Sequence, residues 1–217
     1  MSSSFAGIMF TPAVRAQQEH YGSRAHYAQS AADAGPFAGL GPAEAGFLAH
    51  TDGFFVATVT ETGWPYVQHR GGPRGFVKVL SPARIAFADF RGNRQYVTAG
   101  NVSRDGRVAI IVIDYAHRRR LKLLGTLRFV DVGDADPALV EKLALPGYRA
   151  RIERIAVVDV VAADWNCPQH ITQRLTLDEV EAATQPLRER IAELEARLAP
   201  GSQPREVTGE ISEAAVI

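Results

Sequence analysis

The residues between Gln68 and Tyr96 combine the groups from which proteins build anion-binding sites. A glycine-rich turn comes first, and a strand-like run then passes into Gly92-Asn93-Arg94. Asn93 is of a residue type that caps helices, so we expect a helix to begin there, with free N–H groups and the positive end of its dipole. Arg94 would add a cation in the first helical turn. These groups together suit a phosphate monoester.

The glycine-rich turn at Gly71–Gly75 lets a ligand approach the backbone, because glycine has no Cβ. Arg70, Arg74 and Lys78 lie on or beside this turn and could contact a phosphate or an electron-rich ring. The plain alternative is a wide hairpin loop with solvated basic side chains, followed by an ordinary strand–helix junction. A Walker-type phosphate loop is disfavoured, because the order G-x-x-x-x-G-K-[ST] is absent.

The second stretch whose side chains could bind a ligand or take part in catalysis is WNCPQH, at the end of the last expected strand. Trp165 could form the wall of a ligand site, with hydrogen bonds to ligand heteroatoms from Asn166, Gln169 or His170. The alternative of about the same weight is a structural role, in which a buried cysteine and a half-exposed histidine pack a turn. Metal is disfavoured because a second Cys/His pair is missing. A Cys–His nucleophile pair is disfavoured because residues this close around a proline turn seldom face each other.

Composition limits the kind of protein that carries these groups. The 217 residues are 46% hydrophobic and 22% charged, as in ordinary globular proteins. The 24 basic and 24 acidic residues cancel, so no net field attracts nucleic acid or an anionic membrane, and Arg118-Arg119-Arg120 is expected to be a solvated turn. A single cysteine, the lack of a signal-peptide pattern and the lack of a long apolar run predict a soluble cytoplasmic protein.

Helices are predicted ahead of a strand-rich middle. Thr11-Pro12 is a helix opening, and we expect that helix to reach about Asp33, with Gly22 as its weak point. Gly41-Pro42 opens a shorter helix whose Phe47 and Leu48 would face the core.

From Phe54 the pattern changes to strands. The expected strands are FFVATVTE and PYVQHR as a hairpin, then FVKVL, RIAFADF, RVAIIVIDY, RLKLLGTLRFVDV and RIERIAVVDVVAADW, with short helices at QYVTAGNVSRD and 137–145. The continuous apolar run of RVAIIVIDY predicts a strand buried on both faces. Antiparallel strands joined by short turns favour a small barrel over a βαβ sheet.

A last helix is predicted over residues 176–199. Leu187, Ile191, Leu194 and Leu198 recur there at helical spacing, so the helix would dock on the barrel or on a second subunit, with a kink or restart at Pro186. The domain organisation expected from these patterns is a helical extension over 1–50, a barrel over 51–175, the helix over 176–199 and a loose tail over 200–217.

These blocks, taken in order, resemble the pyridoxamine 5′-phosphate oxidase-like family of FMN-binding split barrels. The resemblance rests on GWPYVQHRGGPRGFVKVL, FADFRGNRQY, NVSRDGRVAIIVIDY, RRRLKLLGTLRFVD and WNCPQHI, and covers about residues 10 to 199. It is strongest to a bacterial branch with an N-terminal helical extension. It implies a mainly β (β+α) split β-barrel with N-terminal helices and a C-terminal helix, forming a homodimer with FMN at the interface.

The resemblance also implies site residues. The FMN phosphate would be held by Asn93 and Arg94, with Arg70 and Lys78 nearby. The residues implied along the flavin and its ribityl chain are His69, Val77, Ala88, Asp89 and Gln95, while Trp165, Asn166 and Gln169 would come from the partner subunit or the rim. One departure matters: the family's true oxidases end in an Arg-x-His motif that grips substrate, whereas this chain runs WNCPQHITQRLT.

The implied function is an FMN-dependent oxidoreductase that passes two electrons to or from a small organic substrate. The missing Arg-x-His motif argues against pyridoxamine phosphate as that substrate. His170 is the candidate catalytic residue, because an imidazole exchanges a proton near neutral pH. The alternatives are a non-catalytic flavin-binding carrier or sensor, and a relative that binds a deazaflavin or a haem, the haem through His69 or His170.

Overall fold

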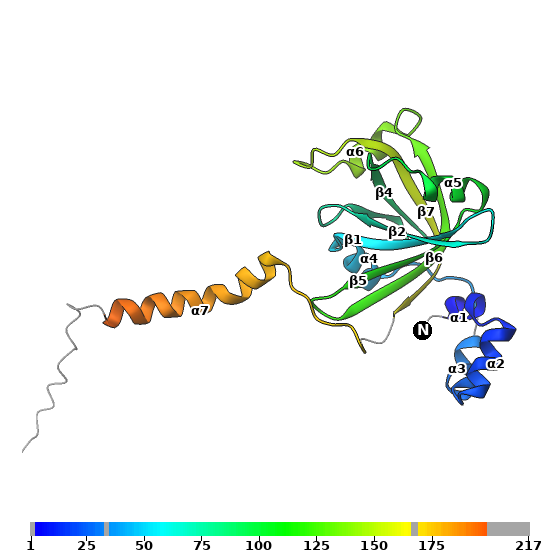
Figure 1. Cartoon of the computed structure of the whole chain (residues 1–217), viewed down its shortest axis with the longest axis horizontal. Helices are drawn as coiled ribbons and strands as arrows, with labels where there is room; N and C mark the ends of the chain where they lie inside the picture. The colour runs from blue at the N-terminus through cyan, green and yellow to red at the C-terminus, as the bar shows by residue number, and fades with distance from the viewer. Residues whose placement is uncertain (1–2, 33–34, 166–168, 199–217) are drawn as a thin grey trace, which may run out of the picture. The chain divides into compact units, whose positions relative to one another are not determined.

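The computed structural model describes residues 3–32, 35–165 and 169–198 (Figure 1). The chain divides into two compact units, residues 1–173 and 174–217. Asn166, Cys167 and the expected tail over 200–217 lie outside the described residues. Among the helices that are described, each is too short or too polar to cross a membrane.

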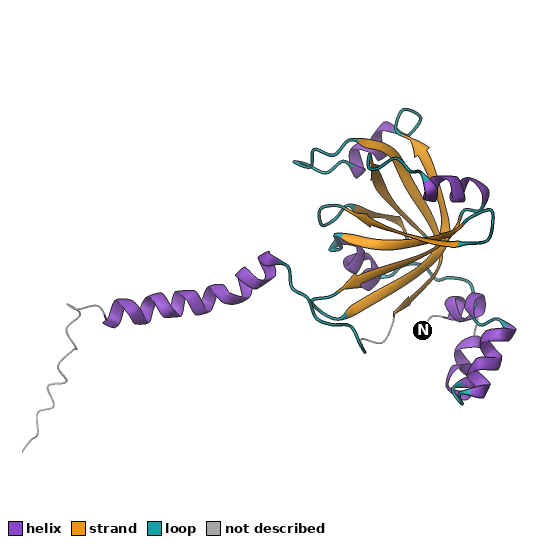
Figure 2. Ribbon diagram, in the orientation of Figure 1, coloured by secondary structure: helices purple, strands orange, loops and turns teal. Residues whose placement is uncertain are grey.

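Seven antiparallel strands form one curved sheet in the order β2-β1-β5-β6-β7-β4-β3 (Figure 2). The strands are β1 (Gly53–Val59), β2 (Pro65–Gly71), β3 (Val77–Ser81), β4 (Arg84–Phe90), β5 (Arg107–Asp114), β6 (Arg119–Asp131) and β7 (Ile152–Trp165). The sheet and its added helices confirm the predicted mainly β split barrel. The expected hairpin is β1–β2, whose turn contains Gly63 at φ +84°.

The helices are α1 (Ser3–Met9), α2 (Pro12–His20), α3 (Arg24–Ala32), α4 (Pro42–Ala49), α5 (Val97–Arg104), α6 (Pro137–Leu143) and α7 (Leu177–Leu198). The prediction of one long helix after Thr11 was wrong, because the chain breaks at Gly22, which has φ +72°. Thr11 does cap α2, since its hydroxyl accepts a hydrogen bond from the backbone N–H of Val14 at 3.4 Å.

The main core fills the inside of the barrel. Leu121, Leu123 and Leu127 of β6 are buried on one face, as their alternation predicts, and Leu48 of α4 is buried with them. Three aromatic rings, from Phe54, Phe76 and Phe87, pack together with centroids 5.1 to 6.2 Å apart. These contacts join the two ends of the curved sheet around a single interior.

The prediction that the strand RVAIIVIDY is buried on both faces was wrong. In β5, Val108, Ile110 and Val112 are buried while Ala109 is exposed, so burial alternates along the strand. The physical reason is that β5 lies between β1 and β6 with one face toward the barrel interior, while the described residues of the barrel leave its other face partly exposed.

β4 is buried on both faces, as is the part of β7 that pairs with it, Ile155–Val158. Ile85 and Phe87 point into the main core, whereas Ala86 and Ala88 pack in a second cluster with Leu143 of α6. Every residue from Ile85 to Asp89 is buried as a result. β4 is therefore held between the barrel interior and α6, which fixes the position of Asp89 near its end.

The pairing of β6 and β7 has a close approach that permits only glycine. A Cβ built on Gly125 would lie 2.5 Å from the carbonyl oxygen of Asp159 and 2.8 Å from Cγ1 of Val158, at a shift in the strand register. We expect Gly125→Ala to lower the free energy of unfolding by about 1–3 kcal/mol, the usual cost of overpacking. Urea denaturation measures this change.

Gly133→Ala is the matched control, because a Cβ there meets nothing within 4 Å. Its effect should stay within about 0.5 kcal/mol. Equal effects of the two substitutions would contradict the packing argument.

Candidate functional site

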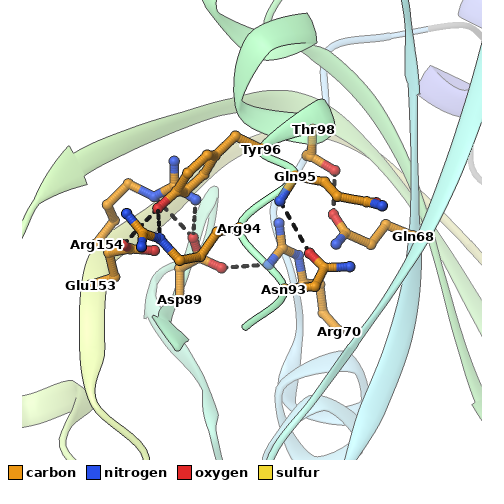
Figure 3. A network of polar contacts seen from close by, with 10 residues as sticks. All are labelled: Gln68, Arg70, Asp89, Asn93, Arg94, Gln95, Tyr96, Thr98, Glu153 and Arg154. Atoms are coloured by element: carbon orange, nitrogen blue, oxygen red, sulfur yellow. Dashed lines mark hydrogen bonds and ion pairs between the residues drawn. The ribbon is translucent and has the colours of Figure 1, made fainter. Parts of the chain in front are cut away.

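A cavity of about 290 Å³ opens where β2, β4 and β7 approach the loop before α5. Its lining includes five charged side chains, namely Arg70, Asp89, Arg94, Glu153 and Arg154. The polar part of the lining is completed by the uncharged side chains of Gln68, Asn93, Tyr96 and Thr98 (Figure 3).

The centre of the site is a buried carboxylate between two arginines. Asp89 is only 2% exposed. Arg70 donates from Nη1 to one carboxylate oxygen of Asp89, and Arg154 donates to the other from Nε at 3.0 Å and from Nη2 at 2.5 Å. Figure 3 shows the two guanidinium groups converging on Asp89 from β2 and β7.

The sheet register brings these three residues together. Asp89 and Arg154 are paired neighbours across β4 and β7, so their side chains lie on the same face. Arg70 points to the interior with Gln68, because side chains alternate along β2. Phe129 of β6 supplies an aromatic face for both cations, with the guanidinium carbons of Arg154 and Arg70 lying 4.5 Å and 5.9 Å from its ring centroid.

The site has more positive charge than its own carboxylates neutralise. Three arginines, Arg70, Arg94 and Arg154, face two carboxylates, Asp89 and Glu153, so the lining carries one net positive charge. Burial lowers the pKa of Arg70 from its ordinary value, while the charge of Asp89 opposes that shift. Nε of Arg70 is buried without a hydrogen-bond partner. An anion would satisfy both the surplus charge and the unpaired donor.

The loop between β4 and α5 differs from its sequence prediction. Asn93 does not cap a helix: its side chain accepts a hydrogen bond from the backbone N–H of Gln95 at 3.2 Å, and the helix begins four residues later at Val97. Arg94 and Tyr96 have φ of 61° and 53°, which interrupts any helical path. Arg94 therefore reaches the cavity from a strained loop and not from a first helical turn.

Tyr96 ties this loop to β7. Its hydroxyl accepts a hydrogen bond from Nε of Arg94 at 3.2 Å and donates one to Oε1 of Glu153 at 2.8 Å. The guanidinium carbon of Arg154 lies 5.1 Å from the centroid of the Tyr96 ring. The hydrogen bond with Tyr96 raises the pKa of Arg94. Arg94 is thus held at the edge of the cavity as a fixed cation.

Sequence reasoning missed several of these residues, Arg154 first among them. A signal was present, because Arg154 shares a strand face with the buried Ala156 and Val158, and an arginine in an inward-facing row needs a partner. Thr98 was also missed; it donates to Oε1 of Gln68 at 2.5 Å and links α5 to β2. No sequence spacing connects these two residues.

Five more of the predicted cofactor residues differ in where they lie relative to the cavity. Ala88 and His69 line the cavity, although the His69 ring stacks edge-on with Phe55 at 5.3 Å on the other face of β2. Val77 is buried in the main core. Lys78 is paired with Ala86, which packs in the second cluster, and does not line the cavity. Gln95 borders a neighbouring open depression instead.

Trp165 lies at the opposite end of β7 from Arg154. Its Nε1 donates to Oε1 of Glu44 at 2.6 Å, and its ring packs against Phe47 at 4.9 Å and under Arg119. The described residues of the following turn, Gln169 and His170, are exposed and do not line the cavity of the same chain. The role of Gln169 at the partner subunit or the rim, and that of His170 as proton donor, stay predictions. In the described ranges no three His, Cys, Asp or Glu side chains gather as a metal site.

The triad generates a stability prediction. Asp89→Asn leaves the largely covered side chains of Arg70 and Arg154, 16% and 14% exposed, side by side without a countercharge. We therefore expect a loss of about 3–5 kcal/mol in the free energy of unfolding, measured by urea denaturation. Asp159→Asn is the control, because Asp159 also pairs with two arginines but at the surface, where such pairs are worth about 0–1 kcal/mol. A loss for Asp89→Asn no larger than that of the control would contradict the argument.

Comparison with known proteins gives one match that covers most of the barrel. The family model described as pyridoxamine 5′-phosphate oxidase matches residues 40–163, more than half of the chain. No curated protein sequence matches.

Solved structures resemble the chain only distantly. HupZ of Group A Streptococcus is 16% identical, with 63% of this chain and all of HupZ covered, at a TM-score of 0.45. An FMN-binding protein from Syntrophomonas wolfei is 11% identical, with 56% of this chain and 81% of that protein covered, at a TM-score of 0.43. A pyridoxamine 5′-phosphate oxidase-related FMN-binding protein from Nostoc punctiforme is 14% identical, with 54% of this chain and 75% of that protein covered, at a TM-score of 0.37. On the extent of the family match, this chain belongs to the pyridoxamine 5′-phosphate oxidase family.

Proposed function

We propose that the chain binds flavin mononucleotide, with the flavin phosphate at the arginine-lined cavity. The observation that carries this proposal is the surplus positive charge of the lining together with the buried, unpartnered Nε of Arg70. A phosphate monoester supplies the charge and the acceptor oxygens that such a site needs. The family match covers the strands and the loop that build the cavity.

In this proposal the residues divide into two groups. Arg94 and Asn93 in the loop would contact the phosphate, with Arg70 behind them, while Asp89 and Arg154 hold Arg70 in place. His69, Ala88 and Gln95 would lie along the ribityl chain and the ring. The flavin, when bound, supplies two-electron redox chemistry, and the protein orients it and keeps water away.

We propose a homodimer with the cofactor at its interface. The outer face of β1 and β2 supports this, because Phe55, Val59 and Val67 are 37%, 49% and 59% exposed there and form an apolar surface with Ile111 of β5. Lys78, Trp165 at the end of β7, and Asn166 and Gln169 after it would meet the cofactor across that interface. The substrate would be a small organic molecule other than pyridoxamine phosphate, with His170 as the proton donor.

Flavin binding is tested by titrating the purified, flavin-free protein with FMN and following the quenching of flavin fluorescence. We expect saturable binding, and a Kd raised about tenfold in Arg94→Ala because a fixed cation beside the phosphate is lost. The difference between the two proteins should shrink at high salt, since Arg94 is exposed to screening.

Arg107→Ala is the charge-matched control, because Arg107 is exposed, pairs with its neighbour Asp105 and does not line the cavity. The control should bind FMN like the parent protein. A parent protein that takes up no FMN, or an equal loss in both variants, would refute the proposed site.

Turnover is tested on the FMN-loaded protein by stopped-flow absorbance. The oxidoreductase proposal predicts that NADH or NADPH reduces the bound flavin and that an added acceptor reoxidises it, both faster than for free FMN. A flavin that binds but is reduced or reoxidised no faster than free FMN would leave a carrier or sensor as the function.

A further inference from the structure

The second unit of the chain contains a helix whose apolar side chains are uncovered. α7 runs over 22 residues, from Leu177 to Leu198. Six large apolar side chains in it are between 41% and 87% exposed: Leu177, Val180, Leu187, Ile191, Leu194 and Leu198. The proposed flavin site belongs to residues 1–173 and does not account for this row.

The spacing of this row is that of a coiled-coil seam. If Leu177 is an a position, the row occupies successive a and d positions of three heptads, with Thr184 as the only polar member. The flanking e and g positions are charged at five of six places, namely Glu181, Arg188, Arg190, Glu195 and Arg197, with Ala183 as the sixth. A helix that lies on a globular surface has a wider apolar stripe that extends into e or g.

α7 has a capping box at its N-terminus, but it also contains a proline that weakens the isolated helix. Thr176 and Glu179 form a capping box, with the N–H of Thr176 donating to the Glu179 side chain at 2.9 Å and the N–H of Glu179 donating to the Thr176 hydroxyl at 3.2 Å. Pro186, at an outward c position, removes one intrahelical hydrogen bond. A helix with this defect and an exposed apolar row needs a partner to stay folded in water.

The polar seam residue is compatible with burial between helices. The Thr184 hydroxyl donates to the carbonyl oxygen of Val180 at 2.9 Å, so its hydrogen-bonding need is met inside its own helix. Its methyl group is then available to pack in the seam.

We propose that the occupant of this surface is α7 of a second copy of the chain, in a parallel two-stranded coiled coil. In a parallel pair, each g position faces the e position of the next heptad in the other helix, which places Arg190 against Glu195 twice by symmetry. The other g–e pairs, Ala183 with Arg188 and Thr176 with Glu181, contain no like charges.

The charges also exclude the opposite orientation. An antiparallel pair sets g against g, and the g positions carry Arg190 and Arg197 but no carboxylate. Arginine would face arginine along that side, which destabilises the pair. The parallel orientation is the one in which charged side chains of opposite sign face each other across the seam.

The first test uses interchain disulfide formation in the full chain, with Cys167→Ser as background. Leu194→Cys places a thiol at a d position, where the two helices of a parallel, in-register pair meet. Ala196→Cys is the matched control at an outward f position, where no charged side chain is lost. Under mild oxidation we expect Leu194→Cys to form a dithiothreitol-reversible dimer on denaturing gels several-fold faster than the control. Equal rates, or no dimer from Leu194→Cys, would overturn the proposal.

The second test is a charge swap in the Leu194→Cys background. Arg190→Glu and Glu195→Arg should each slow disulfide formation several-fold, and the double variant should restore it. Residues five apart do not meet on one helix, so rescue reports contact between helices. Absence of rescue would overturn the parallel pairing. FMN titration of the same proteins separates this result from the flavin site, because a protein that binds FMN without cross-linking contradicts only the coiled coil.

Discussion

The contact on which the site depends is the pairing of one buried carboxylate with two arginines. Asp89 alone neutralises neither Arg70 nor Arg154 fully, yet it fixes both against the Phe129 ring. Along β4 and β7, only a few residues separate the side chains of the packed apolar core from those that line the positively charged cavity. Burying such an arrangement is costly, and its surplus positive charge would be neutralised by an anion, so the proposed binding would stabilise the fold at the same residues.

The local patterns of the chain predicted most of the fold. Alternating leucines in β6, the turn residues around Gly63 and the hydroxyl cap at Thr11 each act within a few residues, so they can be read from the sequence. The β5 prediction was wrong because only one face of the strand is buried by the described residues of the barrel, and an apolar run does not show how many faces of a strand are covered.

The site was harder to predict for the same physical reason. Asn93 and Arg94 could be predicted as site residues from their residue types. The helix start expected there is instead a local turn, which depends on backbone angles that the sequence does not show. Arg154 and Thr98 meet their partners 65 and 30 residues away along the chain, through strand register and helix packing. Long-range pairings of this kind follow from the assembled sheet and leave little trace in residue spacing.

The two-sided burial of β4 has a consequence for how such a barrel can diversify. The strand that carries Asp89 is in contact with the interior on one side and with α6 on the other, so a change of side-chain volume at any of its buried positions disturbs one packed layer or the other. New ligand preferences would therefore have to arise by substitution in the Arg91–Tyr96 loop and at the exposed ends of the neighbouring strands. The packing of β4 thus makes it the fixed frame and leaves the loop as the part open to substitution.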